Sequence, residues 1–112
     1  MKRGKFNNVK TVIDGMTFDS KGEAARYTVL KARQEAGEIS DLKRQTSYRI
    51  TVNGVKVCDY RPDFEYVLQD RTQIVEDFKS PATITPTFRL KVKLMKAVHG
   101  VDVKVVTKPG DA

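Results

Sequence analysis

The chain has 112 residues, of which 39% are hydrophobic and 31% are charged. A length of this order predicts a single domain, residues 1–112, because two halves would each be too short to build a core. The composition is that of a folded protein rather than a disordered one, and no apolar run approaches the roughly 20 residues of a membrane span. Basic residues at the N-terminus are followed by no apolar segment, so we expect no signal peptide.

One cysteine, Cys58, and one histidine, His99, provide too few ligands for a disulfide framework or a structural zinc site. The lone cysteine suits a reducing compartment, so we expect a cytoplasmic protein. The net charge is +7, from 21 lysines and arginines against 14 acids. This excess favours a polyanionic partner such as nucleic acid, because basic side chains neutralise phosphates and release counterions. The alternative is that the charge serves solubility alone.

The first third of the chain predicts an arm, a hairpin and a helix. Residues 1–10 are basic and polar without periodicity and are expected to form a flexible arm. Two short strands, 11–13 and 16–18, are expected to pair around a turn at Asp14-Gly15. Ser20 and Glu23 have the spacing of a capping box, helix formers fill residues 24–36, and Gly37 is expected to end the helix.

The remainder predicts strands around a second helix. Asn53-Gly54 is a strong hairpin signal, so residues 44–52 and 55–59 are expected to pair antiparallel. Thr85 and Pro86 suit an N-cap and a first helical position, and the helix should reach about His99. Further strands are expected over 63–68, 73–79 and 101–106, with a loop over 80–85 and a tail over 107–112. This order predicts an α/β fold with a mixed central β-sheet flanked by helices.

The spacing of acids and lysines on the strands indicates a candidate site. Side chains alternate along residues 73–79, so Asp77 and Lys79 share one face, about 7 Å apart, while Glu76 points to the other. Asp63 begins the preceding strand and would join them across a short hairpin. Phosphodiester hydrolysis uses carboxylates that hold divalent cations and a basic group that stabilises developing charge. A solvated Asp–Lys pair is the alternative, and a β-bulge would exchange Asp77 for Glu76.

Two further residues have two interpretations each. Glu23 either completes the capping box or projects from the first helical turn toward the sheet as a third acid. Lys91 falls inside the apolar arc of the second helix, where it either snorkels to solvent or reaches a phosphate or an acidic site. On the opposite side of that helix lie basic residues that form a solvated face, or a face that contacts a DNA backbone: Arg89, Lys93 and Lys96.

Five segments in order resemble the PD-(D/E)XK nuclease superfamily over roughly residues 5–100. They are KTVIDGMTFDSKGEAARY, ISDLKRQTSY, YRPDFEYVL, IVEDFKS and TFRLKVKLMKAVHG. More closely, the chain resembles a phage-encoded family of small proteins assigned to that superfamily and discussed beside Holliday-junction resolvases. The superfamily motif alone is short and degenerate, but five segments in the right order are much more specific.

The resemblance implies a restriction-endonuclease-like core in the order helix, three strands, helix, strand. It implies that Asp63 and Asp77 bind a metal, Mg²⁺ with Mn²⁺ as a substitute, and that Lys79 is the motif lysine. Glu23 would be the helix-borne acid that joins them as catalytic residue and metal ligand. Many relatives have glycine after the motif lysine, where this chain has Ser80.

We therefore expect a magnesium-dependent DNA endonuclease of phage recombination or DNA processing, acting as a homodimer on branched DNA such as a Holliday junction. Gln45 matches a glutamine that often precedes the first core strand of such nucleases. The residues expected to contact DNA are Lys2, Arg3, Lys5, Gln45 and Lys91. The alternatives are a non-catalytic DNA-binding module that retains the nuclease fold, and a nuclease acting on simple duplex or single-stranded DNA.

Overall fold

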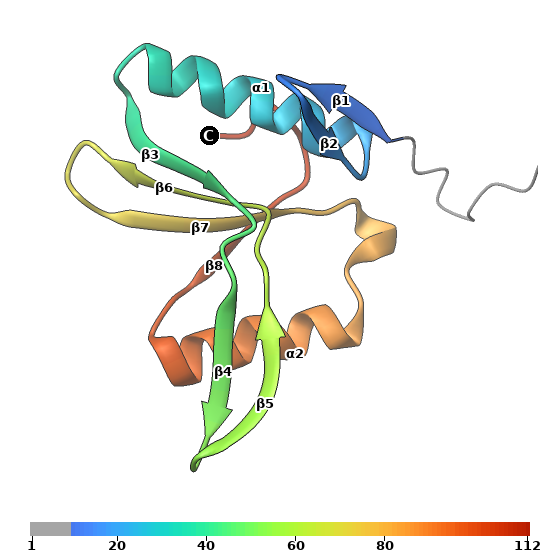
Figure 1. The fold of residues 1–112 in the computed structure, drawn as a ribbon, viewed down its shortest axis with the longest axis vertical. Helices are drawn as coiled ribbons and strands as arrows, with labels where there is room; N and C mark the ends of the chain where they lie inside the picture. Colours follow the sequence, from blue (N-terminus) through green and yellow to red (C-terminus); the bar gives the residue numbers. More distant parts are fainter. Residues whose placement is uncertain (1–9) are drawn as a thin grey trace, which may run out of the picture.

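A four-stranded sheet lies at the centre of the computed structural model, which describes residues 10–112 (Figure 1). Its strands, in spatial order, are β3 (Ile39–Arg44), β6 (Phe64–Leu68), β7 (Gln73–Phe78) and β8 (Val103–Val106). The first three are antiparallel to their neighbours and β8 runs parallel to β7, so the sheet is mixed as predicted. The residues predicted to form a basic arm, including Lys2, Arg3 and Lys5, lie outside the described residues apart from Lys10.

The N-terminal hairpin and the first helix form as the sequence predicts. β1 (Thr11–Ile13) and β2 (Met16–Phe18) pair antiparallel around Asp14-Gly15. α1 (Lys21–Glu35) begins after Ser20, whose hydroxyl accepts a hydrogen bond from the backbone N–H of Glu23 at 3.1 Å. Gly37 has a φ of +79° just beyond the last turn, a conformation that glycine adopts without strain.

The prediction of one continuous strand over residues 44–52 is wrong. β3 ends at Arg44 and pairs with β6, whereas β4 (Tyr48–Val52) pairs with β5 (Val55–Tyr60) as a separate two-stranded sheet. Gln45 divides the two strands because its φ of +54° turns the chain. The sequence did not predict β3, whose pairing with β6 also contains a register shift between Ser40 and Lys43.

The second helix begins at the predicted position but ends differently. α2 (Pro86–Leu94) follows Thr85, whose Oγ1 accepts from the backbone N–H of Phe88 at 3.1 Å. The last turn, Met95–His99, is π-helical rather than α-helical and stops at Gly100, with a φ of +68°. The final strand is shorter than predicted and begins at Val103 instead of residue 101. A single 3-10 turn, Pro81–Thr83, forms within the expected loop.

Two apolar clusters hold these elements together. In one, α1 packs against the central sheet through residues that include Leu30, Phe64 and Tyr66. In the other, α2 and the π-helical turn that follows it pack against the β4–β5 hairpin through Ile50, Tyr60, Phe88 and Met95. The mixed α/β class is therefore confirmed, and residues 10–112 form eight strands in three small sheets. No helix within residues 10–112 is long and apolar enough to cross a membrane.

Candidate functional site

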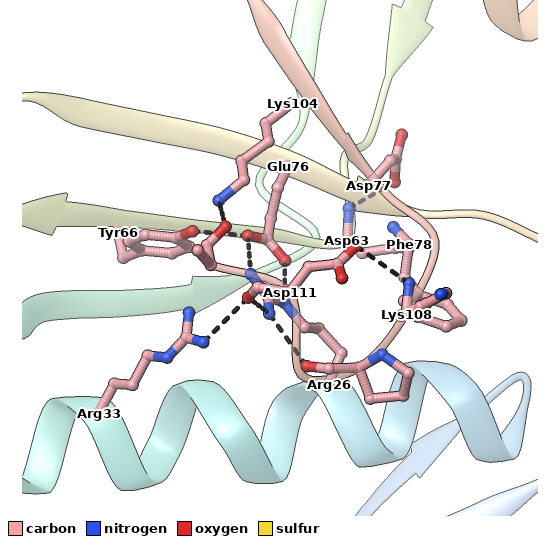
Figure 2. Close-up of polar contacts among 12 residues, drawn as sticks. Arg26, Arg33, Asp63, Tyr66, Glu76, Asp77, Phe78, Lys104, Lys108 and Asp111 are labelled. Carbon is pink, nitrogen blue, oxygen red and sulfur yellow. Dashed lines mark hydrogen bonds and ion pairs between the residues drawn. The ribbon is translucent and has the colours of Figure 1, made fainter.

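Asp63 and Asp77 face each other at the point where β6 begins and β7 ends. Phe64 is the partner of Glu76 across the antiparallel pair, which puts Asp63 opposite Asp77. The backbone N–H of Asp63 donates to Oδ1 of Asp77 at 2.9 Å, and the backbone N–H of Phe78 donates to Oδ2 of Asp63 at 2.8 Å (Figure 2). Each carboxylate is thus held by the backbone of the opposite strand, which fixes its orientation.

The two carboxyl groups of this pair disfavour each other's ionisation. Burial, together with the nearby charges of Asp77 and then Glu23, raises the pKa of Asp63 to about 8. Two carboxylates in a poorly solvated place disfavour double ionisation, and a cation between them would relieve the repulsion. With no cation bound, the pair therefore favours a state in which the two carboxyls share one proton over a state in which both are ionised.

Tyr60, at the end of β5, is a member of the site that the sequence did not reveal. Its hydroxyl donates a hydrogen bond to Oδ2 of Asp77, and its side chain is almost fully buried. Burial and the charge of Asp77 raise the pKa of Tyr60 well above its ordinary value, so the hydroxyl stays a donor. An aromatic residue at the inward phase of a strand is normally read as core, which is why no sequence signal singled it out.

Asp63, Asp77 and Lys79, which the sequence predicts on neighbouring strands, line one cavity of about 450 Å³. Lys79 lies in it with its Nζ 4.9 Å from the centre of the Phe88 ring, in cation–π contact. The Nζ of Lys91 reaches the cavity from α2 and lies 3.5 Å from the carbonyl oxygen of Asp59. The lining residues are Asp59, Tyr60, Arg61, Asp63, Asp77, Lys79, Thr85, Thr87, Phe88 and Lys91. Three predicted site residues and the lysine of the apolar arc therefore share one cavity.

Glu23 lies near this group but does not line the cavity. It is buried on α1, with Oε2 at 3.6 Å from Nη2 of Arg44 and without a hydrogen-bond partner. Burial, followed by the charge of Asp19, raises the pKa of Glu23, while Arg44 lowers it. Its charge contributes to the raised pKa of Asp63, so the two acids are within electrostatic reach of each other.

The carboxylates of the site determine which metal ion it could hold. Within residues 10–112, no three His, Cys, Asp or Glu side chains come close enough to hold a metal together. Magnesium, however, is often bound through one or two carboxylates and completes its shell with waters and substrate phosphates. Asp63 and Asp77 supply that number of hard oxygen donors, so this pair fits a magnesium ion.

Glu76 points to the opposite face of β7, as the two-residue spacing predicts. It forms a fully buried ion pair with Arg26, with its oxygens 2.7 Å from Nε and 2.9 Å from Nη2, and it accepts a bond from the hydroxyl of Tyr66 at 2.6 Å (Figure 2). The predicted tail packs over this network, because Nη1 of Arg26 donates to the carbonyls of Pro109 and Asp111. Glu76 is therefore engaged away from the cavity.

Gln45, expected to contact DNA, is exposed and lies outside the cavity lining. Its backbone N–H donates a hydrogen bond to the carbonyl oxygen of Asp63 at 3.2 Å. Gln45 thus connects the turn after β3 to the segment that carries the first acid, and the structure gives its side chain no assigned role.

Over residues 3–108 the chain matches a family described as "Protein of unknown function (DUF1064)", and it belongs to this family. No curated protein and no solved structure matches it. The nuclease resemblance consequently rests on the residues themselves.

Proposed function

We propose that this member of the DUF1064 family is a metal-dependent DNA endonuclease with a restriction-endonuclease-like core. The observation that carries the proposal is the pair Asp63 and Asp77, opposed in one cavity together with Lys79 and Lys91. A raised carboxyl pKa beside a second acid, in a cavity that also contains basic groups, is typical of functional sites. The order of α1, the sheet strands, α2 and β8 supports the fold assignment.

Asp63 and Asp77 would hold Mg²⁺, or Mn²⁺ in its place, with Glu23 as a nearby third acid. A bound Mg²⁺ supplies a Lewis acid that polarises a phosphate oxygen and lowers the pKa of a water molecule. The chain's own groups then have separate tasks. Lys79 stabilises negative charge that develops on the phosphate, and the hydroxyl of Tyr60 keeps Asp77 oriented.

The substrate we propose is branched DNA. A net charge of +7 favours contact with the phosphate backbone, which carries no sequence information, so the shape of the DNA rather than its sequence would select the substrate. A homodimer would place two cavities for cuts in opposed strands. Size-exclusion chromatography with light scattering tests the dimer, which should have twice the 12.7 kDa mass of the chain.

A non-catalytic DNA-binding protein is the second candidate. Both oxygens of Asp77 already accept hydrogen bonds, from Asp63 and Tyr60, and no trio of metal-ligating side chains occurs in the described part of the chain. These two observations favour a protein that binds DNA without cutting it.

A cleavage assay on end-labelled four-way junction, linear duplex and single strand, with Mg²⁺, with Mn²⁺ and with EDTA, separates these functions. We expect metal-dependent cutting of the junction, and a loss of about 100-fold to 1000-fold in Lys79→Met, the usual cost of removing one charge-stabilising group. Asp77→Asn should be inactive, whereas the exposed control Arg89→Ala should cut normally. Junction binding without cutting under either metal would establish the non-catalytic function. Normal cutting by Asp77→Asn would refute the site.

A further inference from the structure

We infer that the β4–β5 hairpin is a DNA-binding arm that carries the duplex next to the proposed site. The hairpin forms its own two-stranded sheet and extends away from the central sheet, beyond α2 (Figure 1). The inference rests on the proposed function, because it names the surface that receives the DNA to be cut.

One end of the hairpin is continuous with the cavity. Asp59, Tyr60 and Arg61 belong to the cavity lining, and Tyr60 is bonded to Asp77. From Tyr60 to Asn53 the strand runs about 20 Å, from the rise per residue of an extended chain. DNA lying along the hairpin would thus extend directly from the carboxylate pair to the hairpin tip.

The face of the hairpin turned away from α2 is basic. Ile50 and Cys58 pack toward α2, so Arg49, which is adjacent to Ile50, projects from the opposite face. The register shift pairs Lys56 with Thr51 and so puts Lys56 on the face of Arg49, and both basic residues are exposed. Arg61 is exposed at the base of the hairpin. Against these three basic residues, the segment from Tyr48 to Arg61 has a single acid, Asp59, at 2.7 Å from Nζ of Lys56. The face therefore attracts a polyanion.

The tip of the hairpin is apolar and uncovered. Val52, Val55 and Val57 expose 41%, 66% and 51% of their surface. Val52 and Val55 pair across the hairpin beside the turn, and a register shift between Ile50 and Thr51 leaves Val57 without a cross-strand partner. The major groove of DNA admits a two-stranded β-ribbon, and its thymine methyl groups accept apolar contacts. A second copy of the chain fits less well, because the same basic residues on both copies would repel.

Two sets of substitutions with equal charge loss test the basic face. One set is Arg49→Gln, Lys56→Gln and Arg61→Gln. Its control, on exposed residues of α2 and of the turn that follows it, is Arg89→Gln, Lys93→Gln and Lys96→Gln. Binding of labelled junction and duplex is measured by fluorescence anisotropy in EDTA at several salt concentrations. The hairpin set should make the salt dependence weaker, reducing the magnitude of the slope of log K against log salt by about 0.9 for each lost phosphate contact. The control set should leave the slope unchanged. Equal slopes for both sets, or no DNA binding by the wild type, would overturn the inference.

The apolar tip is tested separately with Val52→Ser and Val55→Ser. Their affinity for DNA should fall about tenfold, through lost apolar contact, at an unchanged salt slope. If the substitutions instead convert a dimer to a monomer in light scattering and leave DNA affinity intact, the tip joins two copies and the inference fails. Binding is measured without metal, so it does not depend on cleavage. If the hairpin binds DNA but the protein never cuts it, the nuclease proposal fails and the inference about the hairpin stands.

Discussion

Asp63 links the candidate site to the stability of the fold. Its pKa is about 8 in the folded protein against an ordinary value of 3.8, so the folded chain binds this proton more tightly than the unfolded chain does. The stabilisation from the protonated carboxyl is complete below pH 3.8 and is lost as the pH rises through 8. Asn at this position keeps a carbonyl acceptor for Phe78 and carries no charge.

The metal-free variant Asp63→Asn should therefore become more stable relative to the wild type as the pH rises from about 4 to about 8. Thermal denaturation in EDTA across this range measures the difference in melting temperature between the two proteins. A difference that stays constant with pH would show that Asp63 does not titrate as described.

Magnesium should stabilise the wild type at pH 8 by relieving the repulsion between Asp63 and Asp77. At a concentration ten times Kd the gain is about 1.4 kcal/mol, which a thermal shift assay detects. The gain should vanish in Asp77→Asn and persist in Asp102→Asn, which removes an exposed acid paired with Lys96. Equal gains in all three proteins would mean that the metal binds elsewhere.

Arg26 and Glu76 form the second buried charge pair, on the α1 side of the sheet. Arg26→Met should lower the free energy of unfolding by about 3–5 kcal/mol, because it leaves the Glu76 carboxylate buried without its partner. Adding Glu76→Gln should recover much of the loss, since Gln keeps an acceptor for Tyr66 and carries no charge. Urea denaturation measures the wild type, Arg26→Met, Glu76→Gln and the double variant. Strictly additive losses would contradict this account.

At the scale of elements, local signals predicted what local interactions determine. The hairpin at Asp14-Gly15, the cap at Ser20 and the start of α2 at Thr85 were confirmed because each depends on a few adjacent residues. β3 was missed because its identity as a strand depends on pairing with β6, about 25 residues away. The predicted placement of the site residues likewise succeeded where it depended on adjacent residues and failed where it depended on packing. Strand phase placed Asp77 and Lys79 on one face, whereas the distance of Glu23 from the cavity depends on how α1 packs on the sheet.

That packing is closest at Gly22, where a Cβ would lie 2.4 Å from Cε2 of Phe78. Gly22→Ala should therefore destabilise the protein by about 1–3 kcal/mol through overpacking of the contact between α1 and β7. Adding Phe78→Leu should restore part of the loss by making room. The exposed glycine Gly110 serves as the control, since a Cβ there meets nothing within 4 Å. Chemical denaturation gives the four free energies. A neutral Gly22→Ala would show that Phe78 moves freely.

For the whole molecule, charge predicts how DNA affinity depends on salt. Lys2, Arg3 and Lys5 account for three of the 21 basic residues. Replacing all three by Gln should reduce the magnitude of the slope of log K against log salt by up to about 2.7, from 0.9 per contact. Fluorescence anisotropy at several salt concentrations measures the slope. An unchanged slope would exclude these residues from the DNA-binding surface.

The alternation of Glu76 and Asp77 along β7 also limits how the gene of such a protein can change in length. Gaining or losing one codon within β7 would exchange the faces of the two acids, aiming a glutamate into the cavity and an aspartate toward Arg26. Two codons restore the alternation but move the acid by about 7 Å along the strand. Viable insertions should therefore accumulate at the exposed turn of residues 69–72, where added residues leave both faces intact. The cavity and the buried ion pair thus depend on the same alternation of side chains along β7. A change of length in this strand would disturb both together.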